Sequence, residues 1–242
     1  MALLDGLLHC YAPSLGPTGY RLIDRGPRRI HGVAIAGISA TAWQGAAGGK
    51  WSLRDVGTGF SGCGNAPVTS ARTVIAWFAT TQTSATSKVI YNVAGSTGQD
   101  FAIYQGLSAG QNGIGVSQNG DSINATGYQD GIWHMIGVVN VGTLWTLFFN
   151  GREVTSKTMT TNALSAPATI GAYNSSGILP WIGGIGEITS FTRAVTAAEQ
   201  MELYRDGDGA IGRMLTGQAF PRRRVSQAMA TTTNRRRHRS RE

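Results

Sequence analysis

The sequence is short of several features that would place it in a familiar functional class. Its 242 residues include only two cysteines, Cys10 and Cys63, which are too few for a disulfide framework and whose spacing matches no metal motif. We expect two buried thiols, with a single disulfide as the alternative. No apolar run approaches the roughly 20 residues that a membrane-spanning helix needs, so a soluble protein without membrane insertion is expected.

Charged residues are also few, at 14% of the chain, whereas glycine is abundant, with 34 residues. Because glycine usually makes up about 7% of a protein, this excess predicts many tight turns and bulges. A low-charge surface rich in hydroxyl and amide groups is typical of secreted or particle-borne β proteins. The N-terminal segment has no basic region, and Asp5 and His9 interrupt its apolar stretch, so no cleaved secretory signal is expected.

Patterns for catalysis and metal binding are missing as well. The four histidines are scattered without zinc spacing, and there is no Gly-x-Ser-x-Gly elbow or phosphate loop. Hydrolysis of a glycosidic bond needs two carboxyl groups close together, and alternate positions of one strand would supply them because they share a face. Here Glu187 is followed at those positions by Thr189 and Phe191. We therefore expect no enzyme activity and no cofactor. Calcium stays open, although no dense acidic loop supports it.

The net charge of +8 belongs to the C-terminus. Residues 1–220 carry 13 basic and 12 acidic residues, whereas residues 221–242 carry Glu242 and eight arginines: Arg222, Arg223, Arg224, Arg235, Arg236, Arg237, Arg239 and Arg241. The polar stretch between the two arginine clusters has too few apolar side chains to offset its ordering entropy, so flexibility is predicted. The functional interpretation is electrostatic attachment to nucleic acid or to an acidic partner surface, and the other interpretation is a solubilising tail or an arm that packs on a neighbouring subunit.

Strand candidates follow one another along the body of the chain, and Gly, Asn, Ser or Asp residues separate them. They occupy residues 73–79, 88–93, 101–105, 113–117, 133–141, 144–150, 168–172 and 182–191. With one helix signal near the end, this pattern predicts an all-β fold of two packed antiparallel sheets, a jelly-roll sandwich. We place this domain at residues 1–205 and a Gly- then Arg-rich tail at residues 206–242.

Two local signals are specific. Asn150 and Gly151 lie between two strand candidates, and both tolerate the positive φ that a type I′ hairpin turn needs. Thr196 can cap a helix with its hydroxyl while Glu199, three residues later, reaches back to the free amide. The chain therefore predicts a hairpin followed, after another strand, by one short C-terminal helix.

These segments and their order resemble the concanavalin A-like lectin/glucanase superfamily in its laminin-G-like form. The similarity spans about residues 5–205 and rests on residues 6–11, 22–24, 73–77, 130–134, 147–154 and 184–196. The resemblance implies a two-sheet sandwich, and its motifs are mostly structural. We therefore expect core positions for Trp77, Trp133 and Phe149, and a packed, hydrogen-bonded imidazole for His134.

A binding module is the leading functional interpretation. Tyr173 and Asn174, together with Trp181, combine an aromatic ring, an amide and nearby hydroxyls in one loop, which suits a sugar. The alternative is an ordinary turn in which Trp181 covers the sheet edge.

The missing secretory signal, the laminin-G-like domain and the Arg-rich end together resemble proteins attached to bacteriophage particles. We expect a non-enzymatic virion-associated adhesion or decoration protein on the particle surface. Its body would contact a host glycan or neighbouring virion subunits, with homo-oligomers expected, and its tail would fasten it to the particle. The alternatives are a capsid component whose arginine arm contacts nucleic acid, and a degenerate glycosidase.

Overall fold

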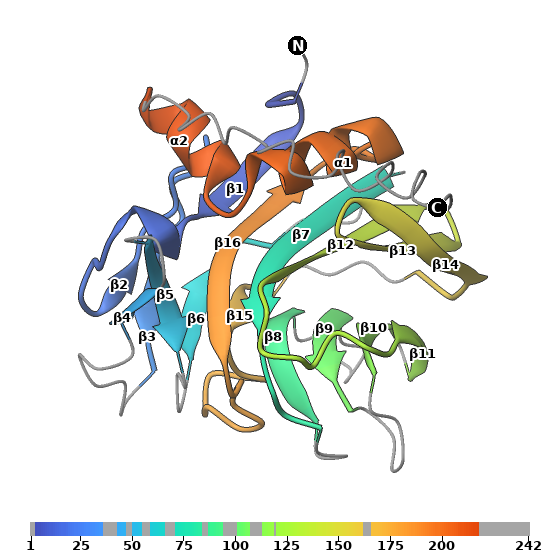
Figure 1. The fold of residues 1–242 in the computed structure, drawn as a ribbon, viewed down its shortest axis with the longest axis horizontal. Coiled ribbons are helices and arrows are strands. Elements are labelled where there is room, and N and C mark those ends of the chain that lie inside the picture. Colours follow the sequence, from blue (N-terminus) through green and yellow to red (C-terminus); the bar gives the residue numbers. More distant parts are fainter. Residues whose placement is uncertain are drawn as a thin grey trace, which may run out of the picture.

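The computed structural model describes residues 3–35, 43–46, 50–54, 59–65, 71–83, 87–93, 101–106, 113–118, 120–161 and 166–217. These residues form two antiparallel sheets of eight strands each, packed face to face (Figure 1). The expected two-sheet jelly-roll sandwich is confirmed.

The first sheet has the order β14-β13-β12-β7-β16-β5-β4, and β1 pairs with β16 beside this path. Its strands are β1 (Leu7–Tyr11), β4 (Trp43–Ala46), β5 (Lys50–Arg54), β7 (Ala71–Ala79), β12 (His134–Val141), β13 (Leu144–Phe149), β14 (Arg152–Thr158) and β16 (Gly184–Phe191).

The second sheet has the order β11-β10-β9-β8-β15-β6-β3-β2, which makes β2 an edge strand. Its strands are β2 (Arg21–Leu22), β3 (Gly32–Ala34), β6 (Phe60–Cys63), β8 (Lys88–Val93), β9 (Phe101–Gln105), β10 (Ile114–Gln118), β11 (Asp121–Ala125) and β15 (Ala168–Ile170).

Strand β7 shows why the central strands are apolar almost without interruption. Successive side chains of a strand point to opposite faces. Val74 and Phe78 belong to the core between the two sheets, whereas Ile75 and Trp77 belong to a second cluster outside the first sheet. Because both faces of β7 are covered, residues 72–79 are all buried, and most of them are apolar.

Two helices cover the outer face of the first sheet (Figure 1): α1 (Ala197–Asp206) and α2 (Ala210–Thr216). A single turn of 3₁₀ helix, η1 (Pro13–Leu15), follows β1. Helix α1 begins with the expected capping box of Thr196 and Glu199.

Helix α2 was not expected, since it lies in the part of the chain assigned to the tail. No helix in the described part of the chain is long and apolar enough to cross a membrane.

The hairpin between β13 and β14 also follows the expectation. Asn150 and Gly151 have φ of 51° and 79°, the left-handed values of a type I′ turn. Cys10 and Cys63 are both buried and free, so the expectation of two thiols is confirmed.

Candidate functional site

Trp181, the aromatic residue of the sequence-predicted patch, lies in the core. Its side chain is fully buried, and its ring meets Phe78 edge-on with 6.0 Å between the centroids. Its indole N–H donates to the carbonyl oxygen of Gly184 at 3.2 Å. The prediction of Trp181 as a glycan contact is therefore corrected, because no ring face is open to a ligand.

Tyr173 and Asn174 lie in the loop between β15 and β16 and are half-buried. The Asn174 side-chain oxygen accepts the Ser176 amide N–H at 3.0 Å, and its carbonyl accepts the Gly177 N–H at 2.9 Å. Tyr173 packs against the small cluster of Val89, Ala102 and Tyr104. The loop is a closed polar turn, and ligand contact by Tyr173 and Asn174 stays a prediction. All eight tail arginines lie outside the described residues.

His134 makes two hydrogen bonds that assign its tautomer. The Asn150 oxygen accepts the Met135 amide N–H at 3.0 Å, so the Asn150 NH₂ group donates to His134 Nδ1, also at 3.0 Å. Nε2 then carries the proton and donates to Asp130 at 3.0 Å. The imidazole ties the hairpin turn to the segment before β12. The expectation of a packed imidazole is confirmed, as are the buried positions of Trp77 and Phe149.

Glu187 and Asp208 are the described carboxyls whose arrangement comes nearest to an acid–base pair. Burial and the neighbouring charge of Asp208 together raise the pKa of Glu187 to about 7, although the hydrogen bond from the Gly212 N–H opposes the shift. However, the Glu187 oxygens accept the N–H groups of Ile211 and Gly212, at 3.2 and 2.7 Å.

Asp208 in turn accepts the Glu187 N–H at 2.6 Å. The two residues are only 4% and 8% exposed. Their oxygens hold α2 on the sheet, and the helix closes them off from substrate. Within the described ranges, no three His, Cys, Asp or Glu side chains gather into a group that could hold a metal ion.

A second buried carboxylate, Asp24, organises the connection between β2 and β3. Its oxygens accept the N–H groups of Cys10, Gly26 and Ile30 at 2.8 to 2.9 Å and His9 Nδ1 at 2.7 Å. Burial raises the pKa of Asp24, but the hydrogen bonds from His9, Cys10 and Gly26 outweigh it and hold the pKa below its usual range. Asp24 is therefore an ionised carboxylate at the centre of this turn.

Four arginines surround Asp24 in the sequence: Arg21, Arg25, Arg28 and Arg29. Arg25 is half-buried and the other three are exposed. No carboxylate in the part of the chain that the structure describes forms an ion pair with any of them. We call residues 20–33 the arginine turn. It forms a cationic surface beside the edge strand of the second sheet.

The sequence interpretation missed this surface because it balanced charge over the whole body of the chain. Four arginines within nine residues, with a single acid among them, was the available signal. That signal becomes meaningful only when Asp24 is known to point inward.

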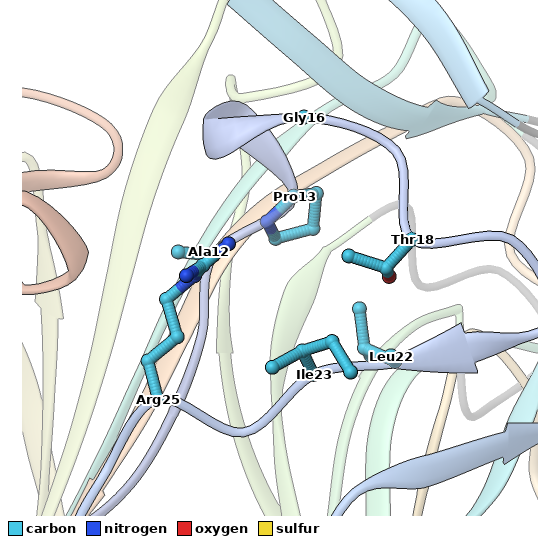
Figure 2. Close-up of a pocket in the computed structure, with 7 residues that line it drawn as sticks. All are labelled: Ala12, Pro13, Gly16, Thr18, Leu22, Ile23 and Arg25. Carbon is cyan, nitrogen blue, oxygen red and sulfur yellow. The ribbon is translucent and has the colours of Figure 1, made fainter. Parts of the chain in front are cut away.

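A shallow hollow lies beside the arginine turn, between η1 and the segment after β2 (Figure 2). Figure 2 shows Pro13, Thr18, Leu22 and Ile23 around it, with Arg25 running along one side past Ala12. Its walls leave no room for a water molecule. This hollow therefore offers no cavity for a ligand.

A comparison of the sequence with models of known protein families assigns this chain to a family. The family model for the concanavalin A-like lectin/glucanases superfamily, of laminin-G type, matches residues 59–199, more than half of the chain. The chain belongs to this superfamily. A search of the curated proteins found no match.

Solved structures share the concanavalin A-like fold at low identity. Domain 4 of AbnA, an extracellular arabinanase from Geobacillus stearothermophilus solved with arabinotriose, is 16% identical with a TM-score of 0.61. The match covers 81% of this chain and 97% of that domain. A Trypanosoma rangeli sialidase is 10% identical with a TM-score of 0.59, and the match covers 82% of this chain and 32% of the sialidase. Identities this low establish the fold and no more.

The superfamily match also separates two parts of this chain. It includes the motif of Asp130 and His134, the Asn150 hairpin and the start of α1. The arginine turn precedes residue 59 and lies outside the match. The residues that identify the concanavalin A-like domain are thus distinct from the arginine turn.

Proposed function

We propose that this chain is a non-enzymatic carbohydrate-binding module displayed on a virus particle. The observation that carries the carbohydrate part is the match over nearly the whole of the AbnA domain, which was solved with an arabinose trisaccharide. A domain of which the match covers 97% is a better guide than an enzyme of which the match covers only 32%.

The absence of catalysis is supported by the carboxyl geometry. Glycoside hydrolysis needs two carboxyl groups that flank a bond of the sugar. The carboxylate oxygens of Glu187 and Asp208 accept hydrogen bonds from backbone N–H groups beneath α2. The oxygens of the buried Asp24 also accept backbone N–H groups. Binding without bond cleavage is the chemistry that the described surface supports.

The position on a virus particle is supported by the sequence of the tail. Its eight arginines follow a nearly neutral body, so charge attraction is available there to fasten the domain to an acidic surface. Labelling of purified particles with an antibody, viewed by electron microscopy, tests this part. Label on the outer surface is expected, whereas label on disrupted particles alone would favour a capsid component whose arm contacts nucleic acid.

A glycan array probed with the full-length protein tests carbohydrate binding. We expect saturable binding to a subset of glycans and no release of reducing sugar from those ligands. Heat-denatured protein serves as the control for nonspecific retention. Failure to bind any glycan would contradict the proposal, and steady release of sugar would contradict its non-enzymatic part.

A further inference from the structure

The arginine turn concentrates cations that the rest of the described chain leaves unneutralised. Arg21, Arg28 and Arg29 are exposed and Arg25 is half-buried, while Asp24, the acid between them, points inward and is 0% exposed. The Asp24 carboxylate already accepts hydrogen bonds from His9 and from three backbone amides. The outward-facing charge of the turn is therefore positive.

Two arginines elsewhere show how the fold can occupy a guanidinium group, whereas the exposed Arg152 and Arg205 form no ion pair among the described residues. Arg193 donates to both oxygens of Glu199, at 2.7 and 2.8 Å. Arg72 is buried between the rings of Phe101 and Trp145, 4.9 Å from each centroid, and donates to Gln118. None of the four arginines in the turn has a carboxylate of this kind among the described residues.

The turn is also held rigidly. Arg25 and Arg28 donate their backbone N–H groups to the carbonyl oxygens of Cys10 and Leu8, at 2.8 and 3.3 Å. Gly26 lies so close to β1 that a Cβ would be 2.6 Å from the Leu8 oxygen. Arg29 has φ of 53°, a left-handed value that an arginine rarely adopts. Since the backbone is already ordered, binding need not bear the entropy cost of ordering it.

Apolar groups accompany these cations on the exposed surface. Tyr20 is 70% exposed, Val33 53% and Ile30 44%, although the second sheet buries most of its large apolar side chains. A guanidinium fork matches a carboxylate or sulfate group, and an aromatic ring packs on the apolar face of a sugar ring. Only a ligand that has both kinds of group uses the whole surface.

We propose that the arginine turn is the glycan-binding surface and that its ligand is an anionic polysaccharide bearing carboxylate or sulfate groups. This assignment rests on the carbohydrate-binding function proposed above and adds the ligand class and the site. A nucleic acid fits less well, because single-strand binding uses a series of aromatic platforms and the turn offers only Tyr20.

Titration of three polysaccharides onto full-length protein tests the assignment: heparin fragments for sulfate, oligogalacturonate for carboxylate, and neutral arabinan. The main variant combines Arg21→Gln, Arg28→Gln and Arg29→Asn, the last because asparagine tolerates the left-handed backbone at that position. The matched control is Arg152→Gln, which removes one exposed cation from β14. A second full-length variant replaces the eight tail arginines with glutamine. Circular dichroism and thermal unfolding check that each variant is folded.

We expect heparin or oligogalacturonate to bind and arabinan to bind weakly. The turn variant should lose at least about tenfold in affinity, since each lost charge-assisted hydrogen bond weakens binding by about that factor. Arg152→Gln should stay within about twofold of the wild type, and the tail variant should lose less than the turn variant. Raised salt should weaken binding of the wild type more than that of the turn variant.

Unchanged affinity of a folded turn variant for the anionic polysaccharides would overturn the assignment, as would a loss that follows the tail variant alone. Binding confined to neutral glycans would overturn it too, yet would leave the carbohydrate-binding function intact. If no glycan bound at all, both proposals would fail. Tighter binding of the tail variant to single-stranded DNA than to any glycan would assign the turn to nucleic acid instead.

Discussion

The arginine turn and the closing module, residues 130–206, use polar residues for opposite purposes. In the closing module, Asp130, His134 and Asn150 form hydrogen bonds with one another and with the backbone. Their polar groups therefore stabilise the fold. In the arginine turn, Asp24 accepts several backbone N–H groups, and three of the arginines around it are exposed.

This difference explains why the family is easy to recognise and the ligand is not. The motifs of the closing module stabilise a hairpin and a helix, and the family match covers most of the module. The arginine turn lies outside that match, and stability of the sandwich does not require four exposed cations there. A binding surface is free to vary where the fold does not need the side chains.

Trp181→Ala is expected to have the largest effect on stability. Truncation of a fully buried tryptophan removes its contact with Phe78 and leaves a cavity, which costs about 4 kcal/mol. Urea denaturation measures the loss, with Tyr20→Ala of the exposed arginine turn as the control, expected within about 0.5 kcal/mol of the wild type. A Trp181→Ala variant that kept its stability but no longer bound glycan would contradict the core position and would make Trp181 a ligand contact.

Asp24→Asn tests whether the carboxylate organises the arginine turn. Asparagine has one acceptor oxygen in place of two, so some of the N–H groups that now donate to Asp24, such as those of His9 and Cys10, lose their acceptor. This loss should destabilise the protein by about 3 kcal/mol. Because the folded pKa of Asp24 is lowered, its contribution is present above the ordinary carboxyl pKa and is lost as pH falls through the folded value. Asp24→Asn should therefore flatten the acid side of a stability–pH curve, and an unchanged acid side would contradict this role.

Glu187 should have the opposite pH dependence. Its folded pKa of about 7 lies above the ordinary glutamate pKa of 4.5, so the buried carboxylate becomes unfavourable as pH rises between these values. The unfolding free energy should fall by about 2 kcal/mol from about pH 5 to about pH 8 through this group. Chemical denaturation across that range measures the slope, and Glu187→Gln should remove it. A slope that persisted in Glu187→Gln would have to come from another group.

Thr196→Ala should have the smallest effect. It removes the hydroxyl that accepts the Glu199 N–H at 3.3 Å at the start of α1, at a cost of about 1 kcal/mol. Thr196→Ser keeps the hydroxyl and should stay within a few tenths of a kcal/mol of the wild type. Equal losses in both variants would show that packing of the threonine methyl group, rather than the cap, stabilises this helix end.

The features that could be predicted from the sequence are those whose cause lies nearby in the chain. The turn at Asn150 and the capping box of Thr196 and Glu199 each depend on residues a few positions apart, and the structure confirms both. The strand candidates and the turn residues between them predicted the two sheets for the same reason, since each of these signals lies within a few positions of the chain.

The features that were missed depend on distant partners. Helix α2 is held by Glu187, whose oxygen accepts the N–H of Gly212 25 residues later, so a Gly-rich stretch after α1 looked like the beginning of a tail. Trp181 is buried because Phe78 lies across the sheet. The arginine turn faces outward because His9 and the backbone draw Asp24 inward. None of these pairings is visible in local sequence.

Hydrogen–deuterium exchange of the full-length protein, with and without saturating anionic polysaccharide, tests the central claim most directly. If the arginine turn is the binding surface, amides of residues 20–33 should exchange more slowly in the complex, while those of residues 130–161 should be unchanged. Protection confined to other segments, such as the loop of Tyr173 and Asn174, with residues 20–33 unaltered, would contradict it.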